Sequence, residues 1–168
     1  SMTYTPMIYT ARLVKHTHPG SKVVFIGPCA AKKLEAMQQE LRSDGDFVLT
    51  YEELMGIFEA KAIDFSQLPD TDDLHDASGL GRGFAAAGGV AAAVEEVLRR
   101  TQPDMEVKIQ RADGLRECRR LLTLAKAGKF DGYLLEGMAC PGGCVAGAGT
   151  MQSIKKSAAV VGMYAKQA

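Results

Sequence analysis

The chain has 168 residues, and its 20 basic and 20 acidic side chains give it no net formal charge at pH 7. The length fits one domain with a substantial core. The charge balance gives no electrostatic basis for binding nucleic acid or an anionic membrane. Apolar runs are short and interrupted by glycine, so we expect no membrane-spanning helix and a cytoplasmic protein.

Helical and strand patterns alternate along the chain. From apolar periodicity and residue propensity we expect, in chain order, a helix at 6–15, a buried strand at 22–26, a helix at 30–42, a strand at 46–50 and a helix at 51–62 that Thr50 and Glu53 cap. After an irregular stretch at 63–82 we expect an alanine-rich helix ending near residue 100, a strand at 106–110, a helix at 114–127, a strand at 131–135 and a helix at 151–168. This order predicts an α/β fold with a parallel or mixed sheet and helices on its faces.

Two polar or glycine-rich stretches invite other interpretations. The aspartates and His75 between residues 63 and 82 could form a divalent-metal loop, but they lack the calcium-loop pattern, which favours a solvated surface loop. The glycines at 79–89 match neither the dinucleotide fingerprint nor the P-loop pattern. They favour a closely packed helix N-terminus instead of a nucleotide site.

Cys140 and Cys144 lie in a glycine-rich stretch that follows the last predicted strand. The intervening Pro-Gly-Gly favours a loop, in which bare backbone N–H groups can approach metal-bound sulfur. This pattern favours an iron–sulfur cluster. Two alternatives stay open: a zinc site with Cys29 as a third ligand, and disulfides, which the close spacing of the two thiols disfavours.

The other two cysteines follow different patterns. Cys29 lies between a predicted strand and a predicted helix, where α/β proteins place their binding sites, although a small buried hydrophobic role is the alternative. Lys32, one helical turn later, could reach an anionic group bound there. Cys118 is expected to pack in the core, on one helix face with Leu115, Leu121 and Leu122.

Three stretches together resemble the H-cluster domain of the iron-only (FeFe) hydrogenases. The family signature M-P-C-x-x-K-x-x-E is similar to GPCAAKKLE at 27–35, and E-x-M-A-C-x-x-G-C-x-x-G-G-G-Q is similar to residues 136–150. Between them, FAAAGGV at 84–90 resembles the family's F-G-A-T-G-G-V. We therefore expect residues 2–168 to be a partial H-cluster domain, with Ser1 left by an expression tag.

The resemblance implies an H-cluster, in which a 4Fe–4S cubane is joined to a two-iron subcluster and hydrogen is interconverted with protons and electrons. It implies that Cys29 and Cys140 bind the cubane and that Cys144 is the bridging thiolate. The two-iron subcluster carries cyanide, carbon monoxide and a bridging dithiolate.

The resemblance also assigns roles to three residues around the two-iron subcluster. Lys32 would donate a hydrogen bond to a cyanide ligand, and Met138 would pack against the subcluster. Glu136 would support the site from behind.

The family's first signature, T-S-C-C/S-P-x-W, would supply the fourth cubane cysteine and is absent from this chain. We therefore expect the chain alone to be inactive and its cysteine loop to be metal-free or disordered. The missing N-terminal part of the same domain, ferredoxin-like electron-carrying clusters and downstream signalling domains are the partners that the resemblance implies.

Several positions depart from the catalytic members of the family. Gly27 stands in place of methionine, which would leave space in the two-iron pocket, and Ala85 and Ala87 stand in place of glycine and threonine. The signature at 136–150 ends in Ala-Gly-Thr instead of Gly-Gly-Gln. These changes resemble the sensory branch of the family. The alternatives are an iron–sulfur protein without the two-iron subcluster and a signalling scaffold.

Overall fold

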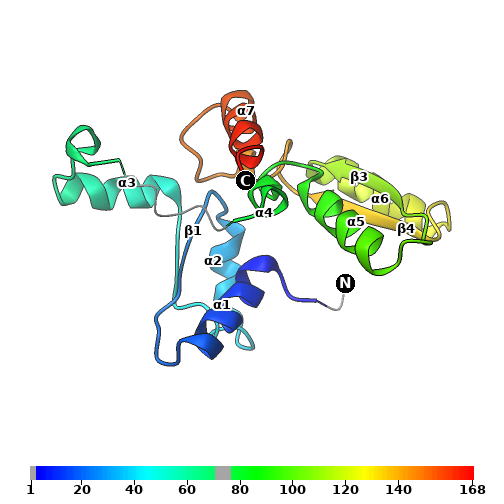
Figure 1. The fold of residues 1–168 in the computed structure, drawn as a ribbon, viewed down its shortest axis with the longest axis horizontal. Coiled ribbons are helices and arrows are strands. Elements are labelled where there is room, and N and C mark those ends of the chain that lie inside the picture. Colours follow the sequence, from blue (N-terminus) through cyan, green and yellow to red (C-terminus); the bar gives the residue numbers. More distant parts are fainter. Residues whose placement is uncertain (1–2, 71–76) are drawn as a thin grey trace. The chain divides into compact units, whose positions relative to one another are not determined.

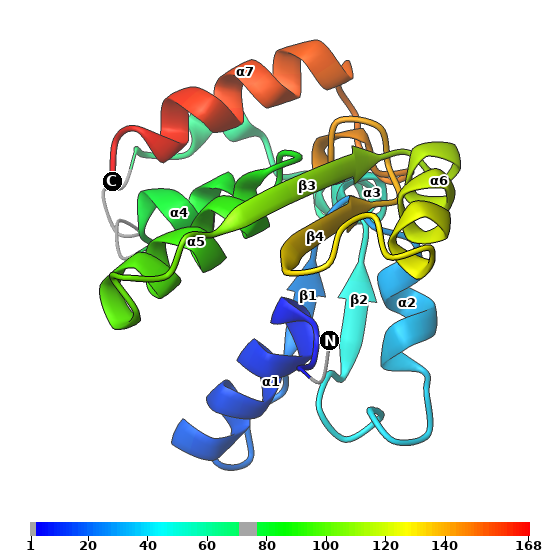
Figure 2. The same ribbon diagram turned by 90° about the vertical axis from the view of Figure 1, so that its right-hand side faces the viewer.

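The computed structural model describes residues 3–70 and 77–168, which form two compact units. The first unit contains the chain up to Pro69 together with Gly147–Met151, and the second contains Asp70–Ala146 and Gln152–Ala168. Each unit has a pair of parallel strands with helices beside them (Figures 1 and 2). The predicted α/β class with parallel strands is confirmed. His75 and most of the acidic stretch considered as a metal loop lie outside the described residues.

The first unit follows the predicted order of elements. They are α1 (Pro6–Thr17), β1 (Val24–Ile26), α2 (Ala31–Ala36), β2 (Phe47–Leu49), α3 (Tyr51–Ala60) and the short 3-10 helix η1 (Phe65–Gln67). The strands β1 and β2 are parallel, with Val24 opposite Phe47 and Ile26 opposite Leu49. The predicted capping box is present, because Thr50 accepts from the Glu53 N–H and Glu53 accepts from the Thr50 N–H.

The core of the first unit forms where α1 meets the segment after α2. Met7 and Ile8 of α1 are buried together with Leu41. The helix predicted at 30–42 ends at Ala36, because the chain then turns and carries Leu41 back to α1. The strand predicted as buried is covered on one face only: Phe25 packs against the core, whereas Val24 and Ile26 are 45% and 44% exposed.

The second unit contains α4 (Gly79–Gly83), α5 (Gly89–Thr101), β3 (Lys108–Asp113), α6 (Leu115–Lys126), β4 (Tyr133–Met138), the 3-10 helix η2 (Cys144–Ala146) and α7 (Ile154–Ala165). The strands β3 and β4 are parallel and in register, with their last residues, Asp113 and Met138, opposite each other. Adjacent strand residues point to opposite faces. Glu136 bonds to α5 and Gly137 lies against Cys118 of α6, so the two helices cover opposite faces of the strand pair.

Three expectations about the second unit are wrong in detail. The strand predicted at 106–110 lies at Lys108–Asp113. The strand predicted at 131–135 runs on to Met138, which places Glu136 and Met138 on the strand instead of in the loop. In α6, Leu121 is 6% exposed but Leu115 and Leu122 are 74% and 64% exposed. The buried stripe is centred on Leu121, and successive helical residues are about 100° apart, so Leu122 lies outside it.

The helices of both units are short. Among the described residues 3–70 and 77–168, none is long and apolar enough to cross a membrane.

Candidate metal-cluster site

Cys140 and Cys144 lie in a tight turn just beyond β4, as the sequence predicts. The Gly114 N–H donates to the Met138 carbonyl at 2.8 Å, where β3 and β4 end side by side. The Gly143 N–H donates to the Cys140 carbonyl at 3.0 Å and closes the turn before η2 begins at Cys144.

The cysteine turn docks on the backbone of the segment between α4 and α5. The Ala87 N–H donates to the Gly142 carbonyl at 3.0 Å, and the Val145 N–H donates to the Ala85 carbonyl at 2.9 Å. Gly143 has a φ of +95°, and a Cβ atom there would lie 2.5 Å from the Ala87 nitrogen. Only glycine fits this approach without a backbone shift. Two of the stretches that carry the family resemblance are therefore in direct contact.

Glu136 ties β4 to the start of α5. The residue is 8% exposed, and its two carboxylate oxygens accept from the N–H groups of Gly88 at 2.7 Å and Ala91 at 2.9 Å. Gly88, the N-cap residue of α5, has no side chain to cap the helix, so a carboxylate from the neighbouring strand takes that place. Both carboxylate oxygens bind the start of α5. Glu136 therefore joins this helix to β4, the strand that leads into the cysteine turn, and in this way supports the turn.

Met138 and Cys118 lie close together at the end of β4. The Cys118 thiol donates to the Met138 carbonyl at 3.3 Å and to the Ala112 carbonyl at 3.5 Å. The thiol is partly buried between α6 and the two strands, next to Gly137. This is the packing position predicted for Cys118. Its thiol lies on the face of the strand pair that α6 covers.

In the first unit, Cys29 follows β1 in a Gly-Pro-Cys turn. The Gly27 N–H donates to the Leu49 carbonyl at 3.0 Å, and the Gly149 N–H donates to the Pro28 carbonyl at 2.9 Å. A Cβ atom on Gly147 would lie 2.3 Å from the same Pro28 oxygen. The last part of the signature at 136–150 thus packs on the turn that presents Cys29, and glycine is required for that approach.

Lys32 is held by a carboxylate of its own helix. Its ammonium lies 2.5 Å from one oxygen of Glu35, whose other oxygen accepts from the Thr5 hydroxyl at 2.6 Å. Lys32 and Glu35 are three residues apart and therefore neighbours on the helix surface, a pairing visible in the sequence. The contribution of Thr5 was missed, because the residue lies 30 positions away from its partner.

The space beside Gly27 is not empty. A Cβ atom on Gly27 would lie 2.9 Å from the ring of Phe25, two residues earlier on the same face of the chain. The sequence predicted free space where the family has methionine. The aromatic ring, which also packs against the core of the first unit, takes part of that space.

The chemistry of the thiols fits an iron–sulfur group. The structure describes all four cysteines, and none is in a disulfide, so the disulfide alternative is wrong for this structure. Thiolates are the ligands that iron–sulfur clusters use, and the positive-φ glycines at 142 and 143 keep bare backbone beside them. Within residues 3–70 and 77–168, no three Cys, His, Asp or Glu side chains are gathered as a ready metal site. Cys29 lies in the first unit, and Cys140 and Cys144 lie in the second.

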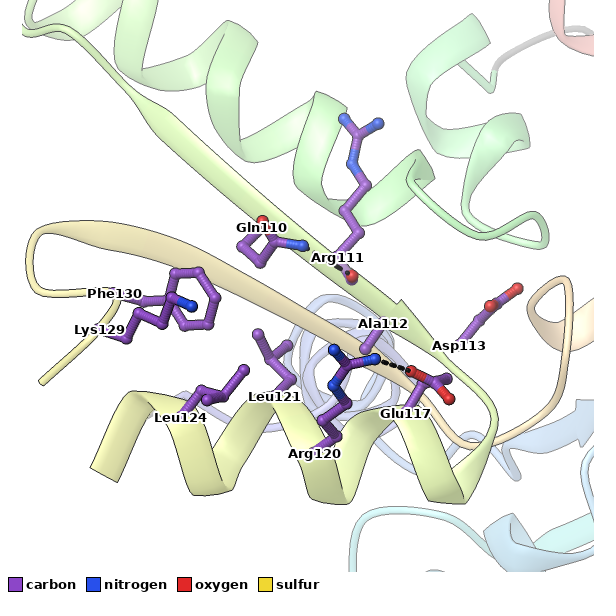
Figure 3. Close-up of a pocket in the computed structure, with 10 residues that line it drawn as sticks. All are labelled: Gln110, Arg111, Ala112, Asp113, Glu117, Arg120, Leu121, Leu124, Lys129 and Phe130. Atoms are coloured by element: carbon purple, nitrogen blue, oxygen red, sulfur yellow. Dashed lines mark hydrogen bonds and ion pairs between the residues drawn. The ribbon is translucent and has the colours of Figure 1, made fainter. Parts of the chain in front are cut away.

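A separate cavity of about 400 Å³ lies between β3 and α6. Its lining mixes apolar side chains from the two elements with charged ones, among them Arg120 and Glu117, which are 3.8 Å apart (Figure 3). No cysteine lines this cavity. Asp113, the last residue of β3, is also among its lining residues.

The chain is similar to known hydrogenases in both sequence and structure. Residues 1–148 match the family model described as iron only hydrogenase large subunit, C-terminal domain. The periplasmic Fe hydrogenase large subunit of Nitratidesulfovibrio vulgaris is 32% identical over 174 residues, covering 84% of this chain and 41% of that protein. The NADP-reducing hydrogenase subunit HndD of Solidesulfovibrio fructosivorans is also 32% identical, covering 76% of this chain and 27% of that protein. A solved variant of FeFe hydrogenase HydA1 from Chlamydomonas reinhardtii shares the fold, with a TM-score of 0.65 and 21% identity over 96% of this chain and 59% of that one.

Proposed function

The chain belongs to the family formed by the C-terminal domain of the iron-only hydrogenase large subunit, and from this premise we propose that it is the part of a longer protein that holds an H-cluster. The chain spans less than half of the length of the two curated relatives described above. The activity that we propose, interconversion of hydrogen with protons and electrons, is therefore an activity of the longer protein. We expect the 168-residue chain alone to be inactive.

The observation that carries this proposal is the way in which the signature at 136–150 is held in place. Its first part docks on Ala85–Ala87 through two backbone hydrogen bonds, and its last part packs on Pro28, beside Cys29. Close approaches at Gly143 and Gly147 make both contacts specific to glycine. A surface loop without a binding role would not require close backbone packing on both sides of Cys144.

We assign the thiols as follows. Cys29 and Cys140 bind the 4Fe–4S cubane, and Cys144 binds the cubane and bridges to the two-iron subcluster. The fourth cubane thiol comes from the N-terminal part of the same domain. Cys118 is not a ligand, because its thiol donates to carbonyls of β3 and β4 within the α6 packing.

The residues around the thiols orient a charged group, pack against the cluster and hold the neighbouring elements together. Glu35 orients the Lys32 ammonium, and we propose that this ammonium donates to an anionic ligand of the cluster. Met138 supplies an apolar contact beside the cysteine turn. Glu136 keeps β4 and α5 together beneath the turn. When bound, the H-cluster supplies the redox chemistry that interconverts hydrogen with protons and electrons.

We further propose that the longer protein works in hydrogen or redox sensing, in the cytoplasm, with ferredoxin-like clusters and signalling domains as partners. The departures at Gly27, Ala85 and Ala87 support this proposal, because they change the packing around the cluster while the ligating thiols are retained. The ring of Phe25 beside Gly27 is part of that changed packing. Four cysteines without a disulfide fit a reducing compartment.

A second candidate function is an iron–sulfur protein that lacks the two-iron subcluster. The three thiols alone are equally compatible with that function. The Lys32 and Glu35 pair supports the first proposal, because an oriented ammonium can donate a charge-assisted hydrogen bond to an anionic cyanide ligand of the two-iron subcluster.

Infrared spectroscopy separates the two candidates. The longer protein, with its upstream sequence, would be expressed anaerobically, loaded with a synthetic two-iron precursor and washed free of excess precursor. Carbon monoxide and cyanide bands that stay with the protein are expected. Their absence from a protein that still binds cubane iron would favour the second candidate and contradict the first.

A further inference from the structure

Asp113 contacts the cysteine turn from outside all three stretches that carry the family resemblance. It is the last residue of β3, and its Oδ2 atom accepts a hydrogen bond from the Gly142 N–H at 2.7 Å. Figure 3 shows its side chain at the end of the strand, directed away from α6. Gly142 lies midway between Cys140 and Cys144, so this bond reaches the centre of the turn.

The strand register brings Asp113 to this point. Parallel strands end at the same edge of a sheet, and Asp113 lies opposite Met138, the residue from which the chain enters the cysteine turn. Gly114, with a φ of +84°, then turns the chain away into α6. The Asp113 side chain therefore lies beside the cysteine turn, while the backbone after it runs away from the turn into α6.

Gly142 is held through both of its backbone polar groups. Its N–H donates to Asp113 and its carbonyl accepts from the Ala87 N–H at 3.0 Å. Its φ of +88° is only one of the conformations open to a glycine in a free chain, so external bonds are needed to select it. A bond from a backbone N–H to a carboxylate is charge-assisted and stronger than a neutral one.

We propose that Asp113 is a positioning residue that holds the turn between Cys140 and Cys144 in the conformation that presents both thiols to the cluster. This inference rests on the proposed function, in which these two thiols bind iron. In this proposal Asp113 is not an iron ligand. It acts through the Gly142 amide, and it is the carboxylate's capacity to accept a hydrogen bond that matters.

The proposal is tested on the metal-free chain by the reactivity of its thiols. Asp113→Ala removes the acceptor, whereas Asp113→Asn keeps a carbonyl oxygen in the same place. Asp104→Ala is the matched control, because Asp104 is an exposed aspartate of the same unit. Each cysteine's alkylation rate would be followed by mass spectrometry. Cys29, in the other unit, and Cys118, on the α6 side, report any general loosening of the fold.

We expect Asp113→Ala to accelerate alkylation of Cys140 and Cys144 on the order of tenfold, the factor that loss of one charge-assisted hydrogen bond corresponds to. Cys29 and Cys118 should react as in the wild type. Asp104→Ala should resemble the wild type at all four cysteines, and Asp113→Asn, which keeps a weaker neutral acceptor, should fall between the wild type and Asp113→Ala at Cys140 and Cys144. Unchanged rates in Asp113→Ala would overturn the proposal, and so would an Asp113→Asn variant that reacts as fast as Asp113→Ala.

If Asp113→Ala accelerates all four thiols because it fails to fold, amide exchange in the wild type decides. A Gly142 amide that exchanges more slowly than a free peptide amide supports the proposal, and one that exchanges at the free rate overturns it. None of these readouts depends on iron. If the infrared experiment gave no bands, the proposed H-cluster would be contradicted, but the role of Asp113 in the turn would not. Failure of the proposed function and failure of the Asp113 proposal can therefore be told apart.

Discussion

At the scale of single residues, Glu136 joins β4, the strand that leads into the cysteine turn, to the start of α5. Glu136→Ala would leave the Gly88 and Ala91 N–H groups without their carboxylate acceptor at the start of α5. We expect a loss of about 2–4 kcal/mol in the free energy of unfolding, measured by urea titration. Glu136→Gln keeps one acceptor oxygen and should lose about half as much. An unchanged urea midpoint in Glu136→Ala would show that these bonds add nothing to stability.

Gly143 gives a second prediction at this scale, because both its conformation and its surroundings exclude a side chain. Gly143→Ala would combine a positive φ with a Cβ atom 2.5 Å from the Ala87 nitrogen. Gly132 is the matched control, since it also has a positive φ but no atom within 4 Å of its Cβ position. Gly132→Ala should cost about 1 kcal/mol from the backbone conformation alone.

We expect Gly143→Ala to be less stable than Gly132→Ala by at least about 1 kcal/mol, because its clash is with backbone and not with a movable side chain. Thermal melts of the two variants measure the difference. Equal melting temperatures would mean that the turn moves away from Ala85–Ala87 at little cost.

At the scale of elements, α6 shows where periodicity failed and why. The sequence placed Leu121 and Leu122 on one buried face, but the structure buries Leu121 and exposes Leu122. Leu121→Ala should therefore destabilise the chain by about 2–4 kcal/mol, whereas Leu122→Ala should change stability by less than about 1 kcal/mol. Urea unfolding of both variants checks this. Similar losses of stability in the two variants would indicate that Leu121 and Leu122 share one buried face, as the sequence predicted.

Asp46, the residue before β2, contacts α1 and the segment before β1, and its titration should be visible in stability. Its carboxylate accepts from the Val23 N–H at 2.8 Å and pairs with Lys15 at 2.9 Å and Lys22 at 3.1 Å. These contacts, the Val23 bond foremost, hold the pKa of Asp46 well below its usual range. A group whose pKa is lowered by folding stabilises the fold above its unfolded pKa and loses that effect as pH falls.

Asp46→Asn should therefore melt at a lower temperature than the wild type at pH 7. The difference between the two should shrink as pH falls below about 4, where the unfolded carboxylate of the wild type takes up its proton. Glu59→Gln, at an exposed position of α3, is the control and should show no such trend. A difference between Asp46→Asn and the wild type that stays constant down to about pH 2 would contradict this account.

The elements themselves were largely readable from sequence. Capping residues marked the start of α3, and Pro6 marked the start of α1, because these signals are local. The end of α2 was not readable, since it depends on Leu41 packing against α1. The burial of β1 was overestimated for the same reason, because apolar composition does not tell how many faces of a strand are covered.

At the scale of the whole molecule, the spacing of Cys140 and Cys144 alone indicated an iron–sulfur site. Only the resemblance of three stretches together to one family indicated that the cluster is an H-cluster. Gly149 contacts Pro28 in the first unit and Gly142 contacts Ala87 in the second, and each contact joins residues far apart in sequence. Thr5 and Asp113 could not be predicted as parts of the site. Each reaches it through one hydrogen bond to a distant partner, and no motif records such a bond.

The central claim is that Cys144 bridges the cubane to a two-iron subcluster, and one pair of variants tests it most directly. Cys144→Ala and Cys118→Ala would be made in the longer protein, loaded with the two-iron precursor and compared by infrared spectroscopy and iron content. We predict that Cys144→Ala loses the carbon monoxide and cyanide bands, while Cys118→Ala keeps them together with the wild-type iron content. Bands that persist in Cys144→Ala, or iron that is lost in Cys118→Ala, would contradict the assignment of the thiols.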